Sequence, residues 1–90
     1  MEKARKRTIL ITGGAAGIGA AAVRKFAGEG WNVVFMDLDA AGGAALEASV
    51  PGTVFVAGDT RRRADIDAAA DTAVERFGRL DSVFANAGIH

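Results

Sequence analysis

The chain has 90 residues, no cysteine and a formal net charge of zero, and half of its residues are hydrophobic. This composition excludes a disulfide framework and a thiolate metal site, and we expect no bound metal, no nucleic-acid partner and no membrane partner. The length suits one small domain, 1–90, in which the basic stretch 1–7 is expected to form a flexible arm. No apolar run is long enough to cross a membrane, and the absence of cysteine is compatible with a cytoplasmic location.

Short apolar runs alternate with helical patterns along the first half of the chain. A run rich in β-branched residues predicts a strand at Thr8–Thr12, and a helical pattern follows from Ile18 to Glu29. A second, almost wholly apolar strand is predicted at Asn32–Asp37, and Asp39 is placed to cap a helix at Ala40–Ser49. The inner face of the first helix is expected to consist of Ile18, Ala22, Val23 and Phe26.

The second half repeats this alternation. Strands are predicted at Thr53–Ala57 and Ser82–Asn86, separated by a helix at Ala64–Phe77 that Gly78 terminates. The inner side of this helix is expected to consist of Ile66, Ala69, Ala70, Ala73, Val74 and Phe77. The order βαβαβαβ favours an α/β fold with a parallel sheet and right-handed crossovers, with the first two helices on one face and the third on the other.

A glycine-rich stretch, TGGAAGIG from Thr12, lies between the first strand and the first helix. Gly13 permits a sharp turn, Gly17 allows a pyrophosphate to approach the backbone, and Gly19 allows the helix to pack closely against the sheet. The helix N-terminus then offers free N–H groups to the phosphates. The stretch therefore predicts a dinucleotide-binding fold of the Rossmann type, a three-layer sandwich with strand order 3-2-1-4.

An acidic residue, Asp37, ends the second predicted strand, where a carboxylate accepts hydrogen bonds from both hydroxyls of an adenine ribose. An NADP site needs a cation for the 2′-phosphate, and neither Ala16 nor Leu38 offers one. The sequence therefore favours NAD over NADP as the cofactor. The loop residues Ala15 and Ile18 complete this part of the predicted cofactor site.

These residues resemble the short-chain dehydrogenase/reductase family, whose glycine motif TGxxxGIG is matched by TGGAAGIG. Asp59-Thr60 is similar to the family's segment after the third strand, where the aspartate contacts the adenine ring. Asn86-Ala87-Gly88 is similar to the end of its NNAG motif, although Ala85 replaces the first asparagine; the resemblance implies that Asn86 steadies the sheet beside the cofactor. It also implies an NAD(P)-dependent oxidoreductase acting on an alcohol/carbonyl pair.

The family's catalytic serine, tyrosine and lysine lie beyond the fourth strand, and this chain contains no tyrosine. We therefore expect no catalytic residue in this chain, and no activity from it alone, because transfer of hydride to a carbonyl needs a nearby proton donor. His90 is expected to be a frayed end, and Arg61-Arg62-Arg63 a solvated helix start rather than a phosphate clamp.

Two interpretations stay open at this point. One is the cofactor-binding half of a truncated oxidoreductase, and the other is a non-catalytic dinucleotide-binding module or one half of a split enzyme. In both, the fourth strand would be a bare sheet edge on which Val83 and Phe84 lack cover. We therefore expect self-association through that strand and the third-helix face, or exchange of elements between copies.

Overall fold

The structure is a computed structural model that describes residues 6–86. Four strands alternate with three helices in it, as the sequence predicts. In chain order these elements are β1 (Thr8–Thr12), α1 (Gly17–Gly28), β2 (Asn32–Asp37), α2 (Ala40–Ser49), β3 (Thr53–Ala57), α3 (Arg63–Phe77) and β4 (Ser82–Ala85).

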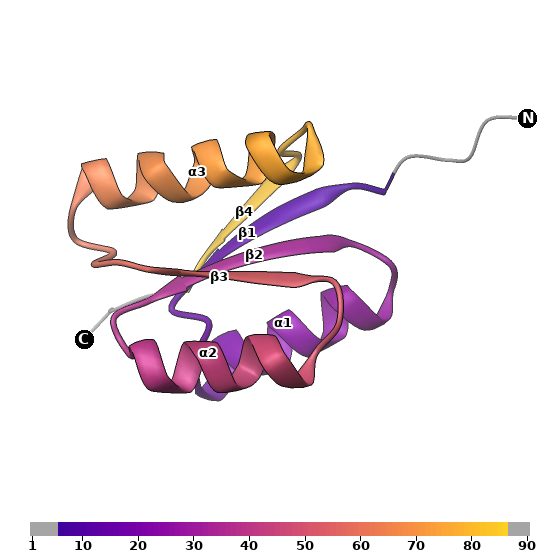
Figure 1. Ribbon diagram of the computed structural model, residues 1–90, viewed down its shortest axis with the longest axis horizontal. Coiled ribbons are helices and arrows are strands. Elements are labelled where there is room, and N and C mark those ends of the chain that lie inside the picture. Colours follow the sequence, from indigo (N-terminus) through magenta and orange to yellow (C-terminus); the bar gives the residue numbers. More distant parts are fainter. Residues whose placement is uncertain (1–5, 87–90) are drawn as a thin grey trace, which may run out of the picture.

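The four strands form one parallel sheet with the order β3-β2-β1-β4. α1 and α2 cover one face of this sheet, and α3 covers the other (Figure 1). This arrangement confirms the predicted Rossmann-type sandwich, its strand order and the distribution of its helices. Because all strands are parallel, their carboxyl ends share one edge of the sheet, which is where α/β folds bind ligands.

The core has two apolar layers, one on each face of the sheet. β1 is buried along its whole length because helices cover both of its faces. The layer beneath α1 and α2 is built on Ile9, Ile11, Val23, Val33, Phe35 and Leu46. The layer beneath α3 is built on Leu10, Val34, Met36, Val54, Ala69 and Ala73. Alternate residues of β1 and β2 therefore anchor opposite layers, which fixes how these strands face the helices.

Several predicted boundaries shift by one residue. α1 starts at Gly17 and ends at Gly28, and β4 ends at Ala85 rather than Asn86. α3 begins at Arg63, with Arg62 at the capping position, because the Asp59–Arg62 segment forms a turn of its own. The predicted stop at Gly78 is confirmed, since its φ of 81° is a left-handed conformation that glycine adopts without strain.

Two residues predicted to face the core are exposed instead. Ile18 is 71% exposed, because it lies in the first turn of α1, beside the loop that carries the chain off the sheet. Val74 is 51% exposed, because Ala73 takes the position facing the sheet and the next residue of a helix points about 100° away. The predicted helix faces are therefore wrong at these two positions.

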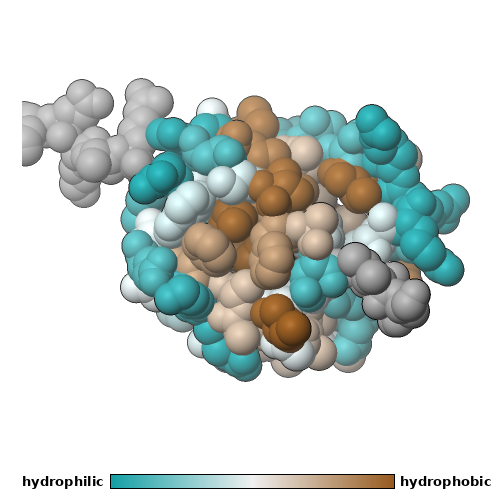
Figure 2. Space-filling view, turned by 180° about the vertical axis from the view of Figure 1, so that it is seen from behind, coloured by the Kyte–Doolittle hydropathy of each residue, from teal (hydrophilic) through white to brown (hydrophobic). Residues whose placement is uncertain are grey.

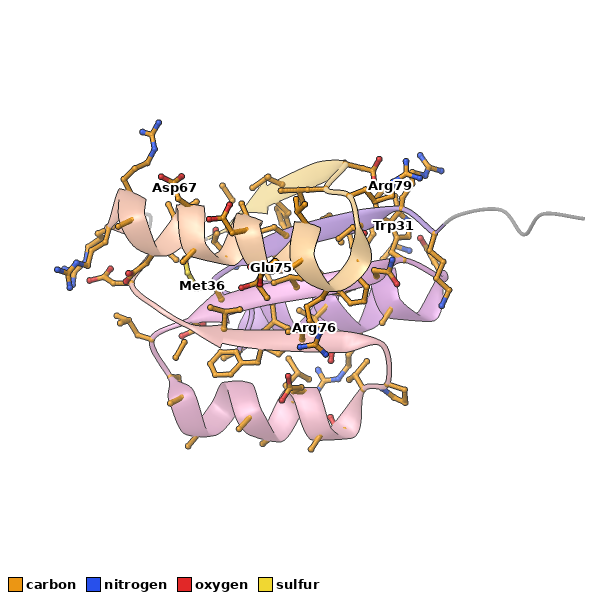
Figure 3. All side chains as sticks on the ribbon, turned by 45° about the horizontal axis from the view of Figure 1, so that its top comes forward. Trp31, Met36, Asp67, Glu75, Arg76 and Arg79 are labelled. Atoms are coloured by element: carbon orange, nitrogen blue, oxygen red, sulfur yellow. The ribbon has the colours of Figure 1, made fainter. Side chains whose placement is uncertain are left out.

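The amino ends of the strands form the other edge of the sheet, where Figure 3 shows Trp31 and Arg79. The backbone oxygen of Arg7 accepts a hydrogen bond from Asn32, and the guanidinium of Arg7 lies 4.9 Å from the Trp31 ring centroid. Arg7 is therefore in contact with the start of β2 and with Trp31. The Asp81 carboxylate accepts hydrogen bonds from the Arg79 guanidinium and from the Thr8 N–H. These bonds hold the pKa of Asp81 below its usual range.

Candidate functional site

The turn between β1 and α1 is fastened to the next strand. The N–H groups of Gly13 and Gly14 both donate to the carbonyl oxygen of Met36, at 2.7 and 3.3 Å. Gly13 has a φ of 72°, so the sharp turn predicted for it is confirmed as a left-handed conformation. A Cβ on Gly14 would come within 2.8 Å of the Phe35 Cβ. The loop therefore lies directly on β2, close to the carboxyl edge of the sheet.

Gly19 explains why α1 can start so close to the sheet. A Cβ at this position would collide with the Gly13 carbonyl oxygen and lie 2.9 Å from the Asn86 Nδ2. The Asn86 Nδ2 donates to the same Gly13 oxygen at 3.2 Å, and the Asn86 N–H donates to the Thr12 Oγ1 at 3.2 Å. The glycine-rich loop and the end of β4, far apart in sequence, therefore meet at one carbonyl group.

The first turn of α1 has no side chain that caps it. Ala16 occupies the capping position, makes no side-chain hydrogen bond, and is followed by no acidic residue in the first turn. The start of α2 differs, because the Asp39 Oδ1 accepts a hydrogen bond from the Gly42 N–H at 2.9 Å. Backbone N–H groups at a helix start carry partial positive charge, so the start of α1 suits an anionic group such as a pyrophosphate.

Gly17 begins α1 with a φ of 60°, and a Cβ built on it would meet nothing within 4 Å. The space beside its Cα is therefore open to a ligand, as the prediction for Gly17 requires. The positive φ adds a second reason for glycine that the sequence alone does not reveal. A larger residue here would strain the backbone and also fill the side from which a pyrophosphate would approach.

Asp37 joins the glycine-rich loop to the end of β2. Its Oδ2 accepts a hydrogen bond from the Ala15 N–H at 3.1 Å, and its Oδ1 accepts one from the Asp39 N–H at 2.9 Å. A carboxylate has about four acceptor sites, so these two bonds leave room for further donors. The carboxylate is half-buried and fixed in direction, whereas the neighbouring Leu38 side chain is 64% exposed.

Asp59 follows β3 at the same edge. Its carboxylate accepts three hydrogen bonds from Arg61: from the backbone N–H and Nε to Oδ1, and from Nη2 to Oδ2. These bonds lower the pKa of Asp59 to about 2, so the side chain is ionised at neutral pH. Thr60 beside it is half-buried.

A family model matches almost all of the chain. The model of the short chain dehydrogenase family covers residues 7–90. This chain belongs to the short-chain dehydrogenase family. The resemblance carried by the glycine motif, Asp59-Thr60 and Asn86-Ala87-Gly88 is thereby confirmed.

Individual members of the family are close in sequence and in structure. The chain is 48% identical over 84 residues to the L-fucose dehydrogenase of Mus musculus, covering 93% of this chain and 31% of that protein. A crystal structure of a short-chain dehydrogenase/reductase of Brucella melitensis (SDR: glucose/ribitol dehydrogenase) superposes with a TM-score of 0.89 and 34% identity, covering 96% of this chain and 36% of that one.

A second Brucella melitensis structure bears on the cofactor. It is a 3-ketoacyl-(acyl-carrier-protein) reductase crystallised with NADH, with a TM-score of 0.82 and 34% identity, and the match covers 88% of this chain and 33% of that one. This chain spans about a third of the length of each of the proteins named here.

The described residues bring most of the predicted cofactor site together at the carboxyl edge of the sheet. The loop, Asp37, Asp59 and Asn86 all lie there, and Ile18, although wrongly assigned to the core, is exposed beside the loop. Ala87 and Gly88 lie outside the described residues. Within residues 6–86 no cluster of His, Asp or Glu side chains is arranged to hold a metal ion, and no helix is long and apolar enough to cross a membrane.

Two contributors to the site were not predicted. The Met36 carbonyl holds the loop, and nothing in a sequence marks one backbone oxygen of a buried strand as an anchor. Arg61 was assigned to a solvated helix start, which its 82% exposed side chain supports, but its hydrogen bonds to Asp59 were missed. The spacing of two residues between an acid and an arginine was the available signal.

Proposed function

We propose that this chain binds the adenosine and pyrophosphate parts of NAD(H), and that the protein containing it oxidises or reduces an alcohol/carbonyl pair. The observation that carries the proposal is the Asp37 carboxylate, held by the Ala15 N–H beside the uncapped start of α1. This arrangement puts an acceptor for two ribose hydroxyls next to a set of donors for phosphate oxygens. Bound nicotinamide dinucleotide supplies or accepts the hydride.

Most of the predicted residues have a role in this proposal. The N–H groups at the start of α1 bind the pyrophosphate, the open side of Gly17 admits it, and Asp37 accepts the ribose hydroxyls. Asn86 keeps the end of β4 against the Gly13 carbonyl and so preserves the edge on which the cofactor lies. The loop residues Ala15, Ala16 and Ile18, together with Leu38, Thr60, Ala87 and Gly88, would line the cofactor.

The same acid determines which dinucleotide is preferred. A 2′-phosphate at this position would face the Asp37 carboxylate, and like charges at close range repel. The neighbouring Leu38 offers no compensating cation. We therefore propose NAD(H) over NADP(H), with Asp37 setting the preference.

Calorimetric titration with NAD and NADP tests this assignment in the wild-type protein, in Asp37→Ala and in Asp71→Ala. Hydrogen bonds to a charged group contribute about 1.5–3 kcal/mol each, so Asp37→Ala should weaken NAD binding at least about tenfold. It should not weaken NADP binding to the same extent, because NADP gains from losing the negative charge. Asp71 is exposed on α3, remote from the glycine-rich loop, and its removal should change neither affinity.

The ratio of the two affinities separates the ribose role from a structural one. If Asp37 only tied down the Ala15 N–H, its loss would loosen the loop and weaken both dinucleotides alike. Equal affinity of the wild-type protein for NAD and NADP would contradict the ribose assignment itself.

Self-association of the chain is the second part of the proposal. The outer edge of β3 is protected, because the Glu47 Oε2 accepts a hydrogen bond from the Phe55 N–H at 2.8 Å. β4 forms the opposite edge. Its Val83 lies beside Leu10 on the α3 face of the sheet and is 56% exposed, because α3 packs mainly on β1 and β2. Figure 2 shows apolar side chains gathered on the side of the molecule that carries β4, with polar ones around them. Unprotected apolar edges favour pairing with another chain.

Light scattering across a concentration series measures this association for the 90-residue chain. We expect the average mass to rise with concentration, and Val83→Lys to reduce the rise because a charge on an edge strand opposes pairing. Leu38→Lys makes a similar change at an exposed apolar residue away from β4 and should leave association intact. A monomer at all concentrations would contradict the proposal.

A further inference from the structure

A hollow lies at the amino ends of the strands, on the edge of the sheet opposite the proposed cofactor site. Its volume is about 370 Å³, which is near the lower limit for small-molecule sites. The residues that line it are Lys6, Asn32, Phe77, Gly78 and Arg79. They come from the segment before β1, the first residue of β2, and the end of α3 with the turn that follows it. Segments far apart in the sequence therefore enclose one space.

Asn32 faces this hollow because of the alternation of the strands. Leu10 and Val34 pack beneath α3, and alternate residues of a strand share a face, so Thr8 and Asn32 lie on that same side. The Asn32 Nδ2 donates to the Thr8 Oγ1 at 3.3 Å. A primary amide has two N–H donors, so one is left for another partner. A polar pair therefore replaces the apolar layer at this end of the sheet.

Positive charge exceeds negative charge around the hollow. The Arg79 guanidinium forms a fork on the Asp81 carboxylate, with Nε 2.8 Å from Oδ2 and Nη2 2.6 Å from Oδ1. These two charges balance, and the guanidinium has further N–H donors outside the fork. The exposed Lys6 adds an ammonium group that this pair does not neutralise. The carboxyl end of α3 contributes partial negative charge, which Arg76 in its last turn offsets.

One wall of the hollow is apolar. Phe77 packs against the core layer beneath α3 and is only half-buried, so part of its ring faces the hollow. A Cβ built on the adjacent Gly78 would meet nothing within 4 Å, so this position leaves the space beside the ring open. An aromatic ring packs favourably against another flat apolar group. The hollow therefore combines an apolar wall with cationic and amide donors.

We propose that this hollow binds a monocarboxylate with an apolar body, its carboxylate between Lys6 and Arg79 and its body against Phe77. Lysine and arginine donors form charge-assisted hydrogen bonds with a carboxylate. The one unmatched positive charge suits a single negative charge, whereas a doubly charged phosphate would exceed it. A small inorganic anion would also leave the space against Phe77 unfilled. Because the glycine-rich loop lies at the other edge of the sheet, the inference does not depend on the proposed binding of NAD(H).

Titration of the isotope-labelled chain with phenylacetate, followed by nuclear magnetic resonance, tests the proposal. Phenylacetamide has the same ring without the charge, and acetate has the charge without the ring. We expect phenylacetate to bind at least about tenfold more tightly than either, because each comparison removes a charged hydrogen-bonding group or a buried ring. The amide signals of Asn32, Phe77, Gly78 and Arg79 should shift, and saturating NAD should not displace phenylacetate.

Three lysine variants locate the charge that binds. Lys6→Met keeps an unbranched side chain without the ammonium, so it should weaken phenylacetate binding about tenfold. Lys6→Arg keeps the charge and should retain affinity within about threefold. Lys25→Met is the matched control, because Lys25 is a 70% exposed lysine on α1 whose partner is Glu29. This variant should bind phenylacetate as the wild type does.

Each outcome supports or overturns the site. The proposal is overturned if phenylacetate does not bind, or binds no more tightly than phenylacetamide or acetate. It is also overturned if the shifted signals lie in the glycine-rich loop, if NAD displaces phenylacetate, if Lys6→Arg loses as much affinity as Lys6→Met, or if Lys6→Met and Lys25→Met have equal effects. Failure of the chain to bind NAD would contradict the proposed function and leave this site unaffected.

Discussion

Substitution of Gly19 by alanine tests the close contact between α1 and the Gly13 carbonyl. Gly28 in the same helix serves as the comparison, because the opposite effect is expected there. A Cβ on Gly19 would collide with the Gly13 carbonyl oxygen and crowd the Asn86 amide. A Cβ on Gly28, at the other end of α1, would meet nothing within 4 Å. Neither glycine has a positive φ, so both positions accept an alanine backbone.

The expected magnitudes have opposite signs. Alanine exceeds glycine in helix propensity by about 0.5–1 kcal/mol, so Gly28→Ala should raise the unfolding free energy by up to that amount. Gly19→Ala gains the same propensity but forces backbone groups apart, and overpacking costs about 1–3 kcal/mol or more. We expect a net loss of about 1–2 kcal/mol for Gly19→Ala. In a domain of this size, each kcal/mol shifts Tm by about 4–8 °C.

Urea and thermal unfolding followed by circular dichroism measure both variants. Gly19→Ala should also weaken NAD binding, because displacement of Gly13 moves the loop, whereas Gly28→Ala should leave binding unchanged. Equal stability of the two variants would show that the start of α1 can shift without cost, and would refute the view that Gly19 fixes α1 against β1 and β4.

Three further outcomes are expected. The 90-residue chain alone should form no NADH from a panel of alcohols, since it has no tyrosine to act as proton donor; a rate that scales with protein and disappears in Gly17→Val would contradict this. Hydrogen bonds from Arg61 lower the pKa of Asp59 from 3.8 to about 2, so the ionised carboxylate stabilises the fold fully above pH 3.8, and this contribution is lost as the pH falls toward about 2. In Arg61→Ala the pKa of Asp59 returns toward its usual value. The urea midpoint of this variant should therefore decrease less steeply with falling pH than that of the wild type. Glu47→Ala should accelerate hydrogen exchange of the Phe55 amide at the β3 edge, and unchanged exchange would show that Glu47 does not protect this edge.

The fold was predictable because local and global signals agree in this chain. Apolar runs such as Asn32–Asp37 are too short and too uniformly buried for helices, and the helical stretches between them impose parallel strands. Boundaries were less predictable at the loops. α3 begins at Arg63, one residue before the predicted start, after a turn in which the Asp59 carboxylate bonds to Arg61 and the Asp65 side chain accepts a bond from the Asp59 N–H.

Helix faces were predicted less well at their margins. A period of 3.6 residues assigns Ile18 and Val74 to the inner side, but it does not tell where along its length a helix lies over the sheet. α3 packs mainly on β1 and β2, so an apolar residue turned away from those strands stays exposed. The exposure of residues at the edge of a helix face depends on where the helix lies over the sheet, and a local sequence pattern does not show this position.

The residue types at the site could be predicted from the sequence better than the contacts between them. Glycines that need positive φ and an acid that ends a strand leave a trace in the sequence, because only certain residue types satisfy them. The partners that orient those groups leave none: the Met36 carbonyl belongs to an ordinary buried residue, and Arg61 is one of three consecutive arginines. The Gly13 carbonyl is bonded by Asn86 across 73 positions of sequence, and this contact exists only because β4 pairs with β1. A motif therefore identifies the residue types at the proposed cofactor site, whereas the pairing of β4 with β1 decides that Asn86 and the Gly13 carbonyl meet there.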